Sequence, residues 1–496
     1  MVGASWKNQL FLDVTGRNDW ASTLVYTYGT GNFSYFYPSV SGSWIITETF
    51  KDKLPRWVTF AKVRGSWAQV GNDTSPYSIN SGYELANYQR GDQKVFGMKI
   101  PDKMKATNLK PERKNAWEVG LDWRFLDSRL GLDLTYYKEN TRDQIMTIDV
   151  PWPSGVKQKL INAGNIQNSG LEIALNTTPI KSGDWQWDLN LTYTRNRNKI
   201  VELSPDVASY INLDGAADYG NYRIASVAKV GADYGMLMSD SWMKTDEKTG
   251  KPLVGYAGSY HTIYYKRGGT VKEVGSMLPD FLGSLNTTLR WKDLSLYVLF
   301  DARFGGYVAS YNSRYATAYG YSGASEKYRT GMTWTTKRTD PSIKDRVFTD
   351  GYIPDVIFDQ GTVVTAPDGT KQDVSGMTYQ QAYEKGFVEP AHLQSATYFM
   401  NNWGNGVIND DWFKKLNYIS LREVTLSYNV PRRLCSYIGA KTLALSLTGR
   451  NLAYLLNTAP NHENPESVRG TGAAQFRMRS FMPYTASYLF TLNATF

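Results

Sequence analysis

The feature that most constrains this chain is a strict alternation of apolar and polar side chains over segments of about ten residues. In 185–194 the apolar side chains include Trp185 and Leu189, and the polar side chains between them include Asp188 and Asn190. One face of such a strand suits lipid and the other suits water, which is typical of strands in a transmembrane β-barrel. The same alternation recurs in 115–125, 129–138 and 170–177.

Aromatic side chains lie near the ends of the apolar faces, as they do at the two interfaces of a membrane. A strand of about ten residues, at about 3.3 Å per residue and tilted near 45°, spans the hydrocarbon layer of an outer membrane. Strands of a soluble β-protein also alternate, so a soluble secreted β-rich binding protein remains an alternative. The aromatic residues are Trp117, Phe125, Trp185, Tyr193 and Trp291.

Short and long connections take turns along the chain, and in outer-membrane barrels short turns face the periplasm and long loops face outward. We therefore expect an all-β fold, a transmembrane antiparallel up-and-down β-barrel wall of about twelve strands. The regions 198–280 and 305–413 are expected to be long extracellular loops, with room for small strands or helices of their own. The expected strands are 8–19, 35–48, 57–71, 115–125, 129–143, 165–180, 185–197, 281–291, 293–304, 414–430, 441–452 and 483–496.

Composition excludes several other classes of protein. The longest apolar run, Leu294 to Phe300, is interrupted by Ser295 and falls far short of the roughly 18 residues that a spanning helix needs. The net charge of +9 comes from scattered basic residues, so nucleic acid is not an expected partner. Cys435 is the only cysteine, which excludes an intrachain disulfide. The residues after Met1 lack the pattern of a signal peptide, and the chain is expected to be a fragment.

No catalytic constellation stands out, and we expect neither an enzyme nor a bound cofactor. His261, His392 and His462 are far apart in sequence, without the spacing that places two ligands on one helix face. No serine of the chain lies in a G-x-S-x-G motif, the sequence around the nucleophile of many serine hydrolases. The oxygen-rich stretches 246–247 and 409–411 could ligate a divalent cation, but solvated turns are the commoner outcome, so no metal is expected.

Short motifs in a fixed order resemble the barrel of SusC/RagA-type TonB-dependent outer-membrane transporters. Each motif is degenerate, but their order is preserved, and the resemblance extends over nearly the whole chain. They are GRND at 16–19, FYPSVSGSW at 36–44, VRGSWAQVGN at 63–72, LKPERKNAWEVGLD at 109–122, YYKENTRDQI at 136–145, AGNIQNSGLEI at 163–173, LFDARFGG at 299–306, YISLREVTLSYNVP at 418–431, GRNL at 449–452 and PYTASYLFTLNATF at 483–496.

The resemblance implies a barrel of about 22 strands around an N-terminal plug, of which 1–496 would be the C-terminal portion without the plug and the first strands. It further implies import of a large nutrient, a glycan or a peptide, in a Bacteroidetes-type host. The implied partners are a SusD-like surface lipoprotein over the outer loops, TonB–ExbB–ExbD acting through the plug, the barrel-assembly machinery and outer-membrane lipid.

An open sheet of about twelve strands would leave two unpaired edges in lipid, which a bilayer does not tolerate. Either further strands complete the barrel, or 8–19 pairs with 483–496 in a smaller closed barrel. The second arrangement would suit a passive outer-membrane channel, which is therefore an alternative to active import.

Three groups of residues are candidates for function. Tyrosines beside a cation, in 307–321, offer flat apolar faces and hydroxyls to sugar rings or peptide backbones; they are Tyr307, Tyr311, Arg314, Tyr315, Tyr319 and Tyr321. Inward polar side chains are expected to face the lumen and the plug; they are Glu118, Asp122, Arg124, Glu172, Asn176, Asp188 and Asn190. The C-terminal strand resembles the signal read by the assembly machinery, through Tyr488, Phe490, Leu492 and Phe496.

Overall fold

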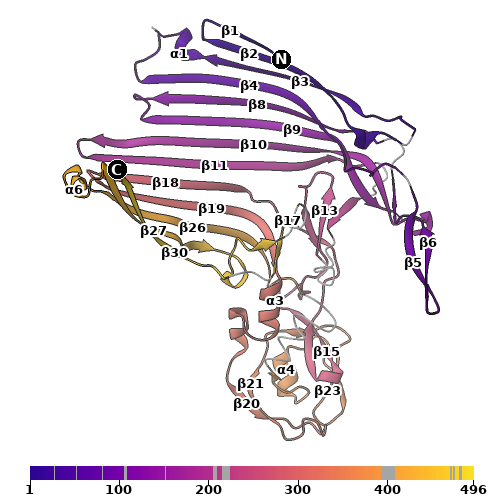
Figure 1. The fold of residues 1–496 in the computed structure, drawn as a ribbon. Coiled ribbons are helices and arrows are strands. Elements are labelled where there is room, and N and C mark those ends of the chain that lie inside the picture. The colour runs from indigo at the N-terminus through magenta and orange to yellow at the C-terminus, as the bar shows by residue number, and fades with distance from the viewer. Residues whose placement is uncertain are drawn as a thin grey trace.

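The computed structural model describes residues 1–26, 28–51, 53–80, 82–105, 109–150, 152–204, 209–214, 224–392, 408–410, 412–469, 472, 475–479 and 483–496. Among these residues the largest element is a 16-stranded sheet whose long strands follow one another in chain order. Figure 1 shows this sheet as a broad curved wall, with short connections at one end and long connections at the other. Neighbouring long strands pair antiparallel, and the predicted all-β, up-and-down fold is confirmed.

Every predicted strand is present in the wall, although several boundaries differ. Val2–Trp6 adds a strand that is too short to show alternation in the sequence. The strands of the main path through the wall are β1 (Val2–Trp6), β2 (Leu10–Trp20), β3 (Ser34–Ile45), β4 (Val58–Asn72), β8 (Glu112–Phe125), β9 (Leu130–Asp149), β10 (Gln158–Ser182), β11 (Trp185–Glu202), β18 (Phe281–Trp291), β19 (Leu294–Ser310), β26 (Phe413–Asn429), β27 (Thr442–Asn457) and β30 (Ser487–Thr495).

Strand β2 lies between β1 and β3, so both of its edges are occupied. The C-terminal strand β30 pairs with β27. Residues 8–19 therefore do not pair with 483–496, and within the described chain the wall is an open sheet bounded by β1 and β30. The small closed barrel considered from the sequence does not form.

The short connections use residues that suit tight turns. Gly183 has a φ of 54° between β10 and β11, a left-handed conformation that glycine adopts without steric cost. Between β8 and β9 the chain turns at Leu126, Asp127 and Ser128, which also have positive φ values. The longer links at this end carry short helices, α1 (Ile46–Thr49) and α6 (Arg432–Ser436).

The long connections carry secondary structure of their own. None of the helices in the described segments is long and apolar enough to cross a membrane. The helices are α3 (Tyr311–Ala318) and α4 (Tyr379–Glu384), with 3-10 turns η1 (Ser22–Leu24), η2 (Trp152–Ser154), η3 (Gly258–Tyr260), η4 (Gly323–Tyr328) and η5 (Pro460–His462). The short strands are β5 (Glu84–Arg90), β6 (Gln93–Lys99), β7 (Lys103–Met104), β12 (Tyr210–Asp214), β13 (Ile224–Lys229), β14 (Met236–Ser239), β15 (Leu253–Ala257), β16 (Thr262–Tyr265), β17 (Lys272–Ser276), β20 (Met332–Thr335), β21 (Val347–Tyr352), β22 (Ile357–Phe358), β23 (Val363–Thr365), β24 (Lys371–Asp373), β25 (Ala391–His392), β28 (Val468–Arg469) and β29 (Arg477–Met478).

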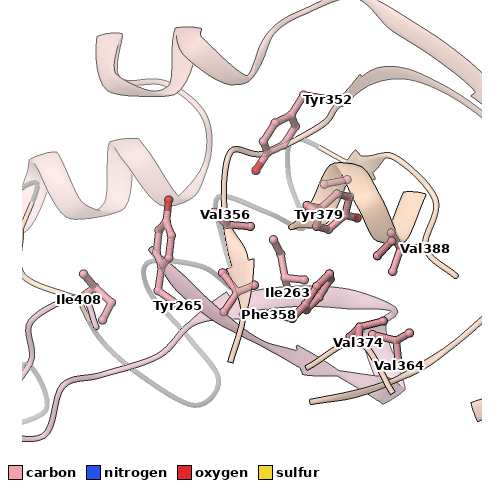
Figure 2. Packing of buried hydrophobic residues seen from close by; sticks show 13 residues of the cluster. Ile263, Tyr265, Tyr352, Val356, Phe358, Val364, Val374, Tyr379, Val388 and Ile408 are labelled. Atoms are coloured by element: carbon pink, nitrogen blue, oxygen red, sulfur yellow. The ribbon is translucent and has the colours of Figure 1, made fainter. Parts of the chain in front are cut away.

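Two of these connections fold together into a compact unit, here called the loop subdomain (residues 243–267 and 332–392). Strand β15 from the first connection pairs in parallel with β22 from the second. Its core contains fully buried Val254 and Phe358, and partly exposed side chains pack around them. Figure 2 shows Ile263 and Phe358 facing each other in this core, beneath Tyr379 of α4. In Figure 1 the loop subdomain lies beyond the long-connection end of the wall, next to α3.

Candidate functional site

The predicted inward charges of β8 share one face of the wall with charges from neighbouring strands. Arg64 of β4 lies between two acidic side chains, 3.8 Å (Nε–Oε1) from Glu118 and 3.0 Å (Nη2–Oδ1) from Asp133 of β9. The Arg124 guanidinium lies 3.5 Å from the carboxylate of Asp122 on the same strand. The structure therefore places the Arg64–Glu118 and Arg124–Asp122 ion pairs on one face of the wall, which is called the polar face below.

The other predicted inward residues continue this face across β10, β11 and β18. Asn176 is the cross-strand partner of Asn190, and the Asn190 amide donates to Asn286 Oδ1 at 2.8 Å. Asp188 accepts a hydrogen bond from Thr178 Oγ1 at 2.8 Å, and lies 3.3 Å from Arg290 Nη1. Glu172 pairs in register with Thr135 and Thr194. All seven predicted residues thus lie on the polar face.

Hydroxyl pairs extend the polar face towards both edges of the wall. Each pair joins adjacent strands, which is the unit that stabilises a sheet. The pairs are Thr15–Ser39 at 2.5 Å, Thr192–Ser284 at 2.7 Å, Thr425–Thr448 at 2.9 Å and Ser427–Ser446 at 2.8 Å.

The opposite face is apolar and exposed over many strands. Leu191 is 44% exposed and Leu447 is 60% exposed. Near the strand ends the rings of Trp185 and Trp291 stack with centroids 5.8 Å apart. A contiguous apolar surface of this kind is rare on monomeric soluble proteins, and it counts against the soluble alternative. Other members of this face include Leu12, Val40, Trp67, Trp117, Val119, Tyr136, Leu296, Leu426 and Phe490.

The candidate substrate-binding stretch is not an irregular loop. It forms the end of β19 and helix α3, which begins after Ser310, whose side chain accepts from Ser313 N at 2.9 Å as an N-cap. Four-residue spacing places tyrosines on one side of the helix. The Tyr311 and Tyr315 rings are 4.6 Å apart, and the Tyr315 and Tyr319 rings 6.3 Å apart. These three residues are called the tyrosine ladder below.

The remaining candidates in this stretch do not belong to the tyrosine ladder. Arg314 is only 3% exposed and lies over the Trp412 ring, with Cζ 5.7 Å from its centroid. Tyr307 stacks on Phe413 at 5.6 Å in a hydrophobic cluster. Tyr321, in contrast, is 85% exposed. Arg314 and Tyr307 are thus supporting residues in the structure, whereas the ladder and Tyr321 remain candidates for contact.

A buried carboxylate lies next to α3, and it is not among the candidate residues predicted from the sequence. Glu463, in the connection after β27, accepts hydrogen bonds from Ser310 Oγ at 2.7 and 2.9 Å, and is 8% exposed. Burial raises the pKa of Glu463 to about 7. The sequence gives a glutamate in a polar segment, NHENPE, and carries no signal that it is buried.

The same connection reaches the polar face through a second acidic residue. Arg422 of β26 forms an ion pair with Asp301 of β19 at 2.8 Å, and its guanidinium also pairs with Glu466. The Tyr454 hydroxyl donates to Glu466 at 2.9 Å. Asp301 and Arg422 occur in the motifs that resemble the SusC/RagA type, but only the fold shows that Glu466 completes the network.

The C-terminal strand exposes the side chains proposed as an assembly signal. Tyr488 is 80% exposed, Phe490 65%, Leu492 57% and Phe496 71%. Phe490 and Leu492 are the register partners of Leu447 and Leu445 in β27. The first three thus continue the apolar face at the free edge of the wall.

The described residues contain no group of three or more His, Cys, Asp or Glu side chains that could hold a metal ion. Asp246 accepts from Thr249 N at 2.9 Å, as in a solvated turn, and Asp410 Oδ2 accepts from Met243 N at 3.0 Å. Asp411 lies outside the described residues. His462 lies in η5, whereas His261 and His392 border one cavity in the loop subdomain.

Solved structures and relatives agree with this architecture. A structure of the RagAB peptide transporter superposes with a TM-score of 0.65 at 17% identity, over 100% of this chain and 47% of that one. TonB-dependent receptor P26 of Formosa agariphila is 24% identical over 90% of this chain and 40% of its own length. TonB-dependent receptor SusC of Bacteroides thetaiotaomicron is 28% identical over 44% of this chain and 22% of its own length.

The chain therefore spans less than half the length of these relatives. A model of the family described as "TonB dependent receptor-like, beta-barrel" matches residues 3–307, which is more than half of the chain. Together with the two-faced antiparallel wall, this match shows that the chain belongs to the TonB-dependent receptor-like β-barrel family, whose members are transporters rather than enzymes.

Proposed function

We propose that the chain forms part of the wall of an outer-membrane transporter that imports a large nutrient, a glycan or a peptide. The observation that carries this proposal is the wall itself, with an exposed apolar face on one side and hydrogen-bonded polar rows on the other. An apolar band around a polar interior is the arrangement of outer-membrane barrels that pass polar solutes. The family membership supports the same function.

In this proposal the polar face lines the lumen and contacts a plug. Glu118, Asp122, Arg124 and Asp188 would hydrogen-bond to plug side chains or to water. Energy would come from TonB–ExbB–ExbD, which would pull the plug aside, and a SusD-like lipoprotein would cover the long connections. The barrel-assembly machinery would read the exposed side chains of β30, and outer-membrane lipid would cover the apolar face.

The tyrosine ladder is the proposed contact for cargo on this wall. Tyr319 is 49% exposed, and it ends a row of three rings at the long-connection end of β19. Aromatic rings with hydroxyls bind ligands that have both an apolar face and polar edges. Arg479 lies over the Tyr311 ring at 4.5 Å and holds the start of the ladder in place.

Uptake by a host strain that lacks the gene tests the function. We expect growth to be lost on one class of nutrient, glycan or peptide, and to return with the wild-type gene. The Tyr315→Ala/Tyr319→Ala variant should raise the KM for uptake about tenfold, whereas Tyr383→Ala in α4 should not change it. Unchanged uptake of every glycan and peptide supplied to the deletion strain would rule out import.

A further inference from the structure

The loop subdomain contains a cavity of about 210 Å³ that is separate from the tyrosine ladder and from the polar face. Both connections contribute to it. Tyr256 and His261 come from the first, and Trp334, Arg338 and Glu389 come from the second. The cavity thus exists only where the two connections pack together.

A buried ion pair fixes one wall of this cavity. Arg338 is 6% exposed, and its Nε lies 3.2 Å from Glu389 Oε2. Its Nη1 donates to Thr365 O at 3.0 Å, so the guanidinium is held from two directions. Glu389 also accepts from Thr336 Oγ1 at 2.9 Å and Lys337 N at 2.6 Å. A buried pair of this kind costs desolvation energy, and these hydrogen bonds fix the positions of both charged groups at the cavity.

Aromatic rings form another part of the lining. The Trp334 and Phe348 rings stack with centroids 4.7 Å apart and planes 17° apart. His392 meets the edge of Phe348 at 5.0 Å, and Arg346 lies over the Phe348 ring at 4.9 Å. These contacts hold the Trp334 and Phe348 rings in a fixed arrangement beside the cavity.

Two histidines and a tyrosine hydroxyl complete the lining. The Tyr256 hydroxyl lies 3.3 Å from His261 Nδ1, and His392 Nε2 lies 2.9 Å from Asp350. Burial lowers the pKa of both His261 and His392. A neutral imidazole offers one hydrogen-bond donor and one acceptor, which suits hydroxyl groups.

We propose that this cavity binds a single sugar ring, such as the terminal residue of a glycan. A sugar ring has an apolar C–H face for an aromatic wall and a rim of hydroxyls for fixed arginine, carboxylate and imidazole groups. The volume is below the roughly 300–1,000 Å³ of sites for larger ligands, so an extended peptide does not fit.

The inference that this cavity binds imported cargo rests on the proposed function. Binding of a sugar to the cavity can nevertheless be measured without transport. The test is calorimetric titration of the full chain in detergent with glucose, galactose, mannose, xylose and glucuronic acid, and with dipeptides as the competing class. We expect at least one sugar to bind with a Kd of about 10 mM or tighter. Glucuronic acid distinguishes an acidic ligand from a neutral one.

Two variants and a control locate the site. Tyr256→Phe removes one hydroxyl and should raise the Kd about threefold to tenfold. Trp334→Ala removes half of the aromatic stack and should abolish binding. Tyr264→Phe makes the same change in the adjacent strand β16, outside the cavity lining, and should leave the Kd unchanged. Hydrogen exchange of residues 253–265 reports whether each variant keeps the loop subdomain folded.

The outcomes separate this site from the import function. The assignment fails if no sugar binds, if dipeptides bind in place of sugars, or if Tyr256→Phe and Trp334→Ala both bind like the wild type. Failure of sugar binding while the deletion strain still loses a nutrient would overturn only the site. Sugar binding in a chain whose deletion changes no uptake would overturn only import.

Discussion

At the scale of single residues, the fold brings together side chains that are far apart in the sequence. Ser310 caps α3 and also donates to Glu463, so one hydroxyl joins the helix to the connection after β27. Glu463 is a buried acid with little water around it. The contact between α3 and this connection should therefore depend on the protonation state of one carboxyl group.

Burial raises the pKa of Glu463 to about 7, from an ordinary value of 4.5. The folded segment therefore binds a proton more tightly than the unfolded segment, so its stability falls as pH rises from 4.5 to 7 and is level above that. The loss is up to about 3 kcal/mol. Protection factors for amides of residues 458–468 should be lower at pH 8 than at pH 5.

Glu463→Gln provides the comparison for this prediction. Glutamine cannot ionise, so protection in 458–468 should not change between pH 5 and pH 8. The exposed Glu384→Gln should keep the wild-type dependence. Equal protection of the wild type at both pH values would show that Glu463 does not control this segment.

Side chains on the same side of helix α3 lie together. This explains why the candidate residues of 307–321 fall into two groups. The sequence shows that 307–321 is rich in tyrosine, and helix periodicity puts Tyr311, Tyr315 and Tyr319 on one side. Arg314 lies on the buried side with Thr317 and Ala318. Because 307–321 lies in an expected long loop, the sequence does not distinguish these candidates from one another, whereas the helical geometry does.

At the scale of elements, alternation locates every strand of the main path through the wall except Val2–Trp6. The period of two is a local property, so strands such as Trp185–Glu202 can be located from the sequence. Strand ends are less well specified. Strand β10 begins at Gln158, before the predicted start at residue 165, and its residues 158–163 pair with β9. Leu160 and Ile161 are buried in hydrophobic clusters, where apolar residues need not alternate, so the alternation does not mark this part of the strand.

Two adjacent positions on β11 test the assignment of faces. Leu191→Arg places a charge on the apolar face and should cost about 2–4 kcal/mol in a bilayer if it lies near the midplane. Thr192→Arg places the same charge on the polar face, at the cost only of the hydrogen bond to Ser284. The folded fraction in lipid vesicles, measured by the gel shift between heated and unheated samples, should fall for Leu191→Arg alone. Equal losses for both variants would contradict the assignment.

At the scale of the whole molecule, the wall and the loop subdomain have separate cores. The subdomain core is built by contacts between residues about 100 positions apart, such as Val254 with Phe358 through β15 and β22. No local pattern in the sequence encodes such contacts, which is why 198–280 and 305–413 look like long loops. The cavity bounded by Tyr256 and Trp334 was hidden for the same reason.

Phe358 tests whether the two cores are independent. Phe358→Ala should cost the subdomain about 3–5 kcal/mol and should raise hydrogen exchange in 253–265, which belongs to the other connection. Exchange in wall strands such as β9 and β10 should stay at its wild-type rate. Val363→Ala, at a position 47% exposed, should change neither region. Increased exchange throughout the wall in Phe358→Ala would show a single cooperative unit.

The parallel pairing of β15 with β22 has a consequence for how the gene can change over time. Two insertions, separated in the chain by the hairpin of β18 and β19, share one core and the Lys244–Asp359 ion pair. Loss of either insertion would expose the apolar surface of the other. Among related genes the two insertions should therefore be gained, lost and resized together, while the hairpin between them keeps a constant length.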